Sequence, residues 1–279
     1  MQSNNPVFRN AAGFNGKAPE GATQTYPGMS DPSTWGTGTP GAPGAIRDTR
    51  GTGRMTIDTV VQKTAISLGL VIVTAMATWI LTPDIEGATN SQLSQLSMFM
   101  IIGAGGAFGL SLANSFKRVV SPPLVLAFCA FEGVALGAVS KFFDASYPGV
   151  VTNAVLGTFA AFAGTLAAYK FFNIQVSARF RKLVISAMFG IVALGLLELV
   201  LSAFGSPIGL FGFGALGLIM AVAGLVLGVF MLIMDFDFVE RGVAAGLEER
   251  ESWRAAFAMT VSLVWIYTNL LRILAIMRN

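Results

Sequence analysis

The chain has 279 residues, of which 54% are hydrophobic and only 12% are charged, and its formal net charge is +3. Soluble domains carry about 25% charged residues, so this composition excludes a soluble protein. The sequence contains no histidine and a single cysteine, Cys129. It therefore excludes an intrachain disulfide, histidine-bound metals and catalysis by Ser-His-Asp or Cys-His groups.

Residues 1–54 differ in composition from the rest of the chain, because proline and glycine recur throughout this stretch. Such a segment has little to bury, so we expect a cytoplasmic N-terminal arm without a folded core of its own. The remainder, residues 55–279, is predicted to form the transmembrane domain. The residues that set the arm apart are Pro19, Pro27, Pro32, Pro40 and Pro43 and the glycines between them, from Gly16 to Gly44.

Seven apolar stretches follow the arm. A bilayer core about 30 Å thick is crossed by roughly 20 apolar residues in an α-helix, and each stretch is close to that length. We therefore predict an all-α, polytopic membrane protein, a seven-transmembrane-helix bundle. The predicted helices span residues 64–81, 96–116, 124–143, 150–172, 183–204, 210–234 and 253–277.

Lysine and arginine alternate between the loops in a way that predicts orientation. They gather before the first helix and in the loops after the second, fourth and sixth helices, whereas the opposite loops hold only Lys141 before the terminal Arg278. Because cytoplasmic loops are enriched in Lys and Arg, we predict a cytoplasmic N-terminus and an external C-terminus. The same bias explains the net charge without nucleic-acid binding.

Three pairs of glycines are spaced four residues apart inside apolar runs. This small-xxx-small spacing lets helix backbones approach closely. We interpret the pairs mainly as packing contacts within the bundle, with dimerisation as the alternative. The pairs are Gly105–Gly109, Gly133–Gly137 and Gly224–Gly228.

Acidic residues within predicted spans are the main candidates for function. Glu132 lies in the middle of the third span, Glu198 in the outer half of the fifth, and Asp235 and Asp237 at the cytoplasmic end of the sixth. Intramembrane charges are costly, and they usually face a bundle interior or a hydrated cavity. Either these acids line an ion path, with Asp235 at its inner mouth, or they form satisfied internal pairs. For Asp237 we expect only an i,i+4 pair with Arg241.

The last span carries a polar stripe. Ser262, Trp265, Asn269 and Arg272 are separated by steps of three, four and three residues, which place them on one helix face. The stripe predicts that the last helix is central in the bundle and lines the candidate ion path. Arg272 is the expected ion partner of Glu198, because both lie toward the outer side.

Catalytic and cofactor motifs are missing from the sequence. Asp235 and Asp237 share one helix and point about 200° apart, so they do not fit an intramembrane aspartyl protease. No phosphate-binding glycine loop follows a strand, and no metal-ligand cluster is present. We therefore expect a protein that is not an enzyme and that needs no cofactor or metal.

The sequence resembles the Bax inhibitor-1/YccA family of membrane proteins, in particular a bacterial branch. The resemblance covers nearly the whole chain apart from the Gly/Pro-rich arm. It is carried by Asn5-Pro6-Val7-Phe8, Met55-Thr56-Ile57-Asp58, Ser121-Pro122-Pro123-Leu124, Glu132-Gly133, Tyr147-Pro148-Gly149, Leu156-Gly157-Thr158-Phe159, Asp235-Phe236-Asp237-Phe238, Arg250-Glu251-Ser252-Trp253, Trp265-Ile266-Tyr267 and Leu271-Arg272.

The resemblance implies a pH-sensitive calcium leak in which two aspartates, on the sixth and seventh helices, share a proton and close a pore. Asp235 matches the first aspartate. The seventh helix has no acid, and Ser262 or Asn269 occupies the second position, so the two-carboxylate gate is incomplete. Any pH response would have to use another carboxylate, such as Glu132.

Two functions follow as hypotheses. The first is a cation or calcium leak channel in a bacterial inner membrane, using Asp235, Glu132, Glu198, Ser262, Asn269 and Arg272. The second is a non-catalytic accessory subunit or regulator of a larger membrane complex, such as a respiratory or protease assembly. In the second hypothesis Asn5, Pro6, Val7 and Phe8 of the arm are candidate contacts for a membrane-protein partner.

Overall fold

A computed structural model describes residues 53–85, 90–172 and 174–278 of the chain. All but the last two residues of the predicted arm, with the candidate partner contacts Asn5 to Phe8, lie outside these ranges. The described residues form seven helices, each long and apolar enough to cross a membrane. They are α2 (Ile57–Leu81), α3 (Asn90–Phe116), α4 (Pro122–Ser146), α5 (Val150–Phe171), α6 (Ala178–Ala203), α7 (Ala215–Ala244) and α8 (Glu251–Arg278).

Helix ends follow local signals in the sequence. The hydroxyl of Thr56 accepts a hydrogen bond from the Thr59 amide, and the Thr59 hydroxyl accepts one from the Thr56 amide, so a capping box begins α2 seven residues before the predicted start. Pro122 stands in the first turn of α4, where a missing amide costs nothing. Gly149 separates α4 from α5 with a φ of 80°, which suits glycine.

The largest departure from the predicted boundaries is at the end of α7. Hydropathy placed this end at residue 234, but the helix continues to Ala244. Asp235 therefore lies inside the helix rather than at its end. The charged residues that follow it include Asp237 and Glu240, which bind Arg181 of α6 and Tyr169 of α5.

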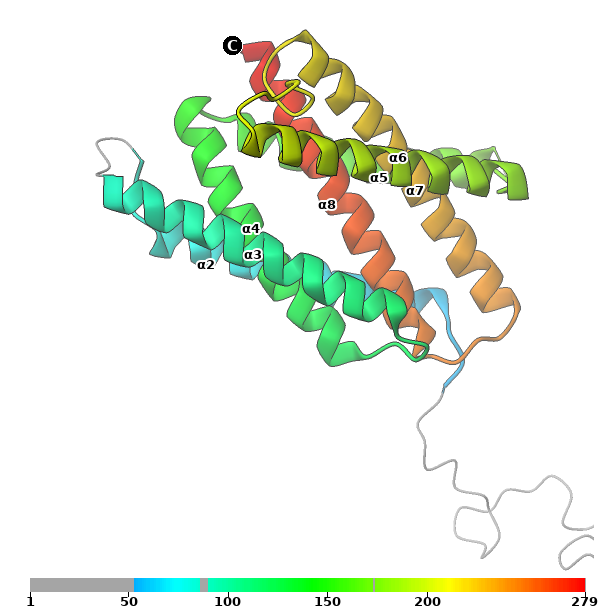
Figure 1. The fold of residues 1–279 in the computed structure, drawn as a ribbon. Coiled ribbons are helices and arrows are strands. Elements are labelled where there is room, and N and C mark those ends of the chain that lie inside the picture. The colour runs from blue at the N-terminus through cyan, green and yellow to red at the C-terminus, as the bar shows by residue number, and fades with distance from the viewer. Residues whose placement is uncertain (1–52, 86–89, 173, 279) are drawn as a thin grey trace, which may run out of the picture. The chain divides into compact units, whose positions relative to one another are not determined.

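The last helix lies at the centre of the bundle, as predicted. Helix α8 packs against α2, α4, α5 and α7, and Figure 1 shows it passing between the other helices. Its buried side chains, which include Leu263, Ile266 and Leu271, contribute to two hydrophobic clusters, one shared with α4 and one with α7. Among the described helices, α3 packs against α4 alone and α6 against α7 alone.

Two of the three glycine pairs pack within the bundle. A Cβ atom on Gly133 or Gly137 would overlap α2, and one on Gly224 or Gly228 would overlap side chains of α8. The prediction of close helix packing is confirmed at these pairs. It is wrong for Gly105 and Gly109, which have open space around them. Helix α3 instead meets α4 through Gly103 and Gly106, where added Cβ atoms would overlap Ala135 and Phe131.

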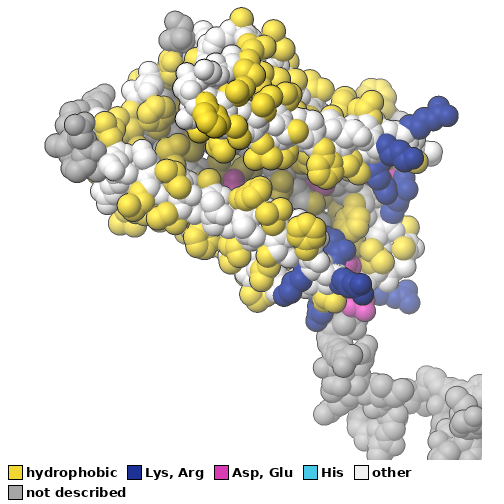
Figure 2. All heavy atoms as spheres, in the orientation of Figure 1, with side chains coloured by type: hydrophobic (Ala, Val, Ile, Leu, Met, Phe, Trp, Pro, Cys, Tyr) yellow, Lys and Arg dark blue, Asp and Glu magenta, His cyan; other side chains and the backbone are white. Residues whose placement is uncertain are grey.

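Charge is distributed unevenly over the described part of the chain. Lys and Arg side chains gather at the end of the bundle where α2 and α8 begin, and most of the remaining visible surface is hydrophobic or uncharged (Figure 2). At the opposite end, Lys141 is buried and its ammonium donates to the carbonyl oxygens of Trp79 and Thr82, at 2.9 and 2.5 Å. Lys141 thus satisfies the C-terminal carbonyls of α2.

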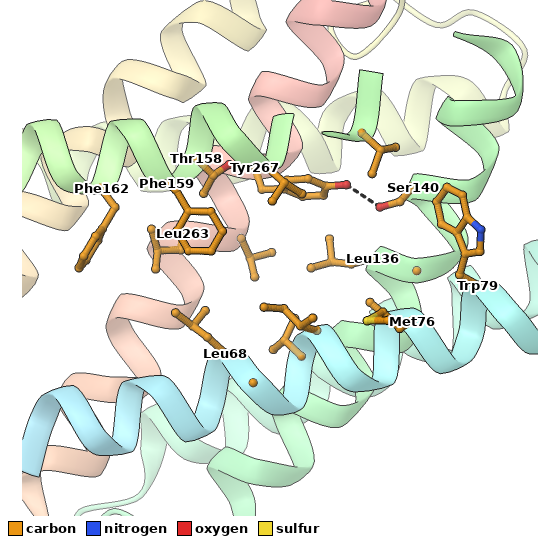
Figure 3. A pocket seen from close by; sticks show the side chains of 18 of the residues that line it. Leu68, Met76, Trp79, Leu136, Ser140, Thr158, Phe159, Phe162, Leu263 and Tyr267 are labelled. Carbon is orange, nitrogen blue, oxygen red and sulfur yellow. Dashed lines mark hydrogen bonds between the residues drawn. The ribbon is translucent and has the colours of Figure 1, made fainter. Parts of the chain in front are cut away.

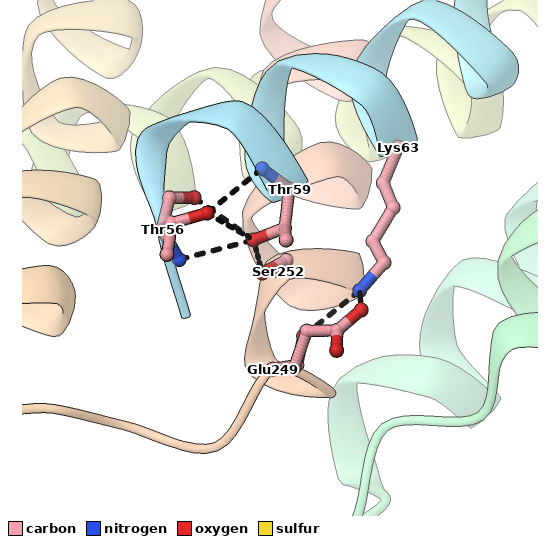
Figure 4. Close-up of polar contacts among 5 residues, drawn as sticks. All are labelled: Thr56, Thr59, Lys63, Glu249 and Ser252. Carbon is pink, nitrogen blue, oxygen red and sulfur yellow. Dashed lines mark hydrogen bonds and ion pairs between the residues drawn. The ribbon is translucent and has the colours of Figure 1, made fainter. Parts of the chain in front are cut away.

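The basic end is closed by a short contact that we call the strap, residues 53–56. The strap runs antiparallel to the loop between α7 and α8: the Met55 amide donates to the Leu247 carbonyl at 2.8 Å, and the Glu249 amide donates to the Gly53 carbonyl at 2.7 Å. Beside it, Lys63 forms an ion pair with Glu249 at 2.8 Å (Figure 4). The start of α2 is therefore fixed to the start of α8.

Candidate functional site: the polar seam between α7 and α8

Three hydrogen bonds connect one face of α8 to α7, and we call this row the polar seam. The Ser262 hydroxyl donates to the Asp235 carboxylate at 2.5 Å, the Trp265 indole donates to the Gly224 carbonyl at 2.8 Å, and the Arg272 guanidinium donates to the Gly217 carbonyl at 3.4 Å. These α8 residues belong to the predicted stripe. The structure therefore places the stripe against α7.

Asp235 and Ser262 form the innermost contact of the seam. Ser262 is 1% exposed and Asp235 is half-buried. Of the two residues that sequence alone left open as the partner of Asp235, the geometry selects Ser262. An ionised carboxylate only accepts hydrogen bonds, and a serine hydroxyl can donate one, so the contact forms without a proton on Asp235.

Asn269 lies further along the seam and has a packing role. Its amide donates to the Trp265 carbonyl one turn earlier, at 2.8 Å, and its side chain packs against Gly224. A larger residue at position 224 would displace it. Asn269 is therefore part of the seam but does not contact Asp235.

The outer end of the seam borders a small cavity of about 180 Å³. Polar α8 residues Thr268, Asn269 and Arg272 line it together with Trp265, and α6, α7 and the loop between them complete its wall. The guanidinium of Arg272 lies 5.2 Å from the centre of the Phe211 ring. The stripe thus both locks α8 to α7 and faces a cavity.

The predicted ion pair between Glu198 and Arg272 does not form. Glu198 accepts hydrogen bonds from the amides of Ile208 and Gly209, at 3.1 and 2.8 Å, and Arg272 donates to the carbonyls of Leu210 and Gly217. Both side chains bind backbone groups at the junction of α6 and α7. These groups need partners inside a membrane as much as the charges do.

The inner end of α7 is held by a second set of ion pairs. Asp237 is 4% exposed and binds Arg181 of α6 at 3.2 Å and Arg241 at 2.9 Å. The i,i+4 pair was predicted and is confirmed, but the contribution of α6 was not. Asp237 and Asp235 point to different neighbours, α6 and α8, as their angular separation on one helix requires.

Glu132 lies apart from the polar seam. It is half-buried on α4, and within the described residues it has no hydrogen bond or ion pair. Helices α4 and α7 do not pack against each other. Glu132 and Asp235 therefore do not belong to one wall of a common path.

The sequence of the chain matches a known family of proteins. A family profile described as Bax inhibitor 1 like matches residues 5–279 of the chain. The chain belongs to the Bax inhibitor 1-like family. Among curated proteins, no significant match to the chain was found. In this Bax inhibitor 1-like chain, the aspartate expected on the sixth span is Asp235, and Ser262 is the group that faces it on the last span.

Sequence analysis missed several polar contacts of this Bax inhibitor 1-like bundle. Arg181 was counted only as a topology signal, and the hydroxyl of Tyr169, which donates to Glu240 at 2.5 Å, was not singled out. Each contact joins residues more than 50 positions apart, so no short-range spacing of residues in the sequence indicates it. One signal was present: the Asp235–Asp237 spacing requires partners on two different helices.

Proposed function

We propose that this Bax inhibitor 1-like protein is a slow cation leak in a bacterial inner membrane, with its N-terminus in the cytoplasm. The path would follow the polar seam, and the contact between Asp235 and Ser262 would be its gate. One observation carries the proposal: an acid within a membrane-spanning helix is held at 2.5 Å by the central helix. An intramembrane acid of this kind usually marks an ion or proton pathway.

The charges around the seam agree with a low conductance for cations. Asp235 supplies the negative charge that a cation needs in a medium where desolvation is costly. Arg272 borders the cavity at the outer end and repels cations there. Cations pass slowly along a path that attracts them at its inner site and repels them at its outer end. Calcium or another cation would therefore cross the membrane at a low rate.

The gate differs physically from a pair of carboxyl groups. Two carboxylates at hydrogen-bond distance cannot both be ionised, so such a pair stays closed only while it shares a proton. Ser262 donates its own hydroxyl proton and needs none from solution. We therefore expect the closed contact to persist when the pH rises.

Flux into vesicles tests this gate. The purified protein, reconstituted with an internal calcium dye, is expected to admit calcium at a rate that changes less between about pH 5 and 8 than the rate of a variant with two facing carboxyl groups. Ser262→Asp creates such a pair, and its flux should rise about tenfold or more above the wild-type change over that range as the shared proton is lost. Ser262→Asn, similar in size but uncharged, is the matched control and should vary with pH no more than the wild type.

Two further variants locate the path. Asp235→Asn removes the attractive charge and should reduce calcium flux about tenfold, whereas Glu132→Gln should leave it within about twofold because Glu132 lies outside the seam. A wild-type protein that passes no cation at any pH would contradict the leak proposal, as would a Glu132→Gln variant that alone abolishes flux.

An accessory role in a larger membrane complex is the second candidate, and α6 favours it. Among the described helices α6 packs only against α7, and it leaves Leu183, Phe189, Leu196 and Leu199 exposed. A partner helix would cover this surface. The absence of flux, combined with a stoichiometric protein partner that co-purifies in mild detergent and is lost on deletion of residues 1–50, would support this role over the leak.

A further inference from the structure

A long apolar groove lies between α2 and α5. Both helices pack against α8, but they do not pack against each other. The space between them has a volume of about 660 Å³, with α4 and α8 forming its floor. Figure 3 shows Leu68 and Met76 of α2 on one side of this space and Phe159 and Phe162 of α5 on the other.

Apart from the indole N–H of Trp79 at one end, the N–H and O–H groups among the lining side chains bind partners within the protein. The hydroxyls of Ser140 and Tyr267 bind each other at 2.6 Å, and Thr158 donates to the Ala154 carbonyl at 2.8 Å (Figure 3). The other lining side chains are almost all aliphatic or aromatic. Water in such a space would lack the two to four polar partners it needs. The groove therefore suits a hydrocarbon.

The groove runs along the direction in which the helices cross the membrane. On α2 its lining extends from Ala65 to Ile80, about 22 Å at the rise of an α-helix. It reaches Trp79 near the end of α2 but stops about two turns short of the basic end, where Ile57 begins the helix. A lipid tail in one leaflet spans about half of the 30 Å hydrocarbon core, so the groove is long enough for one tail.

Length distinguishes a lipid tail from a partner helix. A transmembrane helix crosses the whole hydrocarbon core of about 30 Å. The groove extends for only about 22 Å along α2 and ends about two turns before the basic end. The Gly/Pro-rich arm is a poor occupant, because it would bring unsatisfied backbone groups into the hydrocarbon region.

We propose that the α2–α5 groove binds one acyl chain of a phospholipid from the leaflet at the Trp79 end. Trp79 stands where aromatic side chains meet the lipid headgroup region. Leu263, Val264 and Tyr267 of α8 form part of the binding surface. The bound chain would fill the gap between α2 and α5 and support the side of α8 that faces away from the polar seam.

Gly69 offers a way to block the groove without disturbing its walls. It lines the groove, and a Cβ atom built on it meets no other atom within 4 Å. Gly69→Phe would place a ring in the groove, and Gly69→Leu is a smaller blocker in case the ring disturbs folding. Gly105 has equally open surroundings but lies on α3, outside the groove, so Gly105→Phe is the matched control.

Photo-crosslinking tests the proposal. The full-length protein is reconstituted in vesicles of phosphatidylethanolamine and phosphatidylglycerol that contain phosphatidylethanolamine with a diazirine in its acyl chain, irradiated, digested and sequenced by mass spectrometry. We expect labels concentrated on groove residues of α2 and α5. Labelling there should fall about tenfold in Gly69→Phe, fall severalfold in Gly69→Leu, and stay within about twofold in Gly105→Phe.

Two results would overturn the proposal. One is labelling spread evenly over the lipid-facing sides of α2, α3 and α5 and unchanged by both Gly69 variants, which would mean ordinary annular lipid. The other is labelling that falls equally in Gly105→Phe. Circular dichroism and a monodisperse elution profile establish that each variant is folded.

Discussion

Glu198 illustrates how single residues stabilise this bundle. Its carboxylate accepts two backbone hydrogen bonds from the loop after α6, while the side chain itself is buried. Both hydrogen bonds are part-buried, so water replaces the carboxylate only in part when it is removed. An unsatisfied buried donor costs about 1–3 kcal/mol, so the loop depends on this one side chain.

Replacing Glu198 should therefore destabilise the protein. We expect Glu198→Ala to lose about 1–3 kcal/mol of unfolding free energy because it strands both amides, and Glu198→Gln to lose less because one acceptor oxygen remains. Thermal unfolding in detergent, followed by circular dichroism, measures the difference. Ser206→Ala, an exposed change in the same loop, serves as control. Equal stability of Glu198→Ala and wild type would refute this role.

The sequence pointed to Glu198 and Arg272 as buried polar residues but assigned their partners wrongly. Glu198 and Arg272 were paired with each other because opposite charges at similar depth are expected to attract. Each instead binds backbone groups at the α6–α7 junction. Every residue has the same backbone N–H and C=O groups, so the residue types in the sequence do not indicate which of these groups a buried side chain will bind.

The helices pack where glycine allows it, and this determines which substitutions they tolerate. Gly224 and Gly228 lie against α8, whereas Gly105 and Gly109 face open space on α3. The spacing is the same in both pairs. Burial distinguishes them, because a small-xxx-small pattern indicates a face that can pack but not whether a helix is there to meet it.

Valine at these positions should separate the two pairs. Gly224→Val would displace Asn269 and cost about 1–3 kcal/mol, as overpacked cores do. Gly109→Val, a matched change on an exposed face, should be neutral or slightly stabilising because valine is a better helix former than glycine. Unfolding temperatures in one detergent compare them. Equal losses in both variants would contradict the packing assignment.

Helix existence was predictable at the scale of the element, and helix ends were less so. All seven spans follow from runs of about 20 apolar residues. The end of α7 was misplaced because Asp235, Asp237 and Arg241 resemble a solvated helix end. An ion pair with Arg181 of α6 and a hydrogen bond from Ser262 of α8 stabilise two of these carboxylates within the helix. Such partners become visible only in three dimensions.

Most basic side chains of the described residues lie at one end of the bundle, with Lys141, Arg272 and Arg278 as the exceptions at the other end. This distribution supports the proposed orientation. In the described residues this end includes the start of α6, with Arg179 exposed, while Ser206 is exposed at the other end of α6.

Cys129 is fully buried. The natural cysteine is therefore a low background for chemical labelling.

Labelling of introduced cysteines tests the orientation. A membrane-impermeant maleimide added to intact cells should modify Ser206→Cys, and should modify Arg179→Cys only after the membrane is permeabilised. The wild-type chain, which keeps Cys129, is the background control. The opposite pattern of labelling would invert the proposed topology and move the Trp79 end of the groove to the cytoplasmic leaflet.

The central position of α8 was predictable because a polar stripe needs surroundings other than lipid. The groove between α2 and α5 was not predictable, because its residues have the same apolar side chains as any lipid-facing helix surface. Which apolar surfaces meet lipid and which enclose a cavity depends on helix crossing geometry. Composition and periodicity do not contain that geometry.

The strap connects the start of the transmembrane domain to the loop between α7 and α8. Gly53 and Met55 are hydrogen-bonded to the loop that joins the ends of α7 and α8, and those two helices carry Asp235 and Ser262. A pull at Gly53 would therefore act on the loop between α7 and α8 as well as on the start of α2. If the Asp235–Ser262 contact is the proposed gate, the strap joins the start of the transmembrane domain to both helices of that gate through two backbone hydrogen bonds.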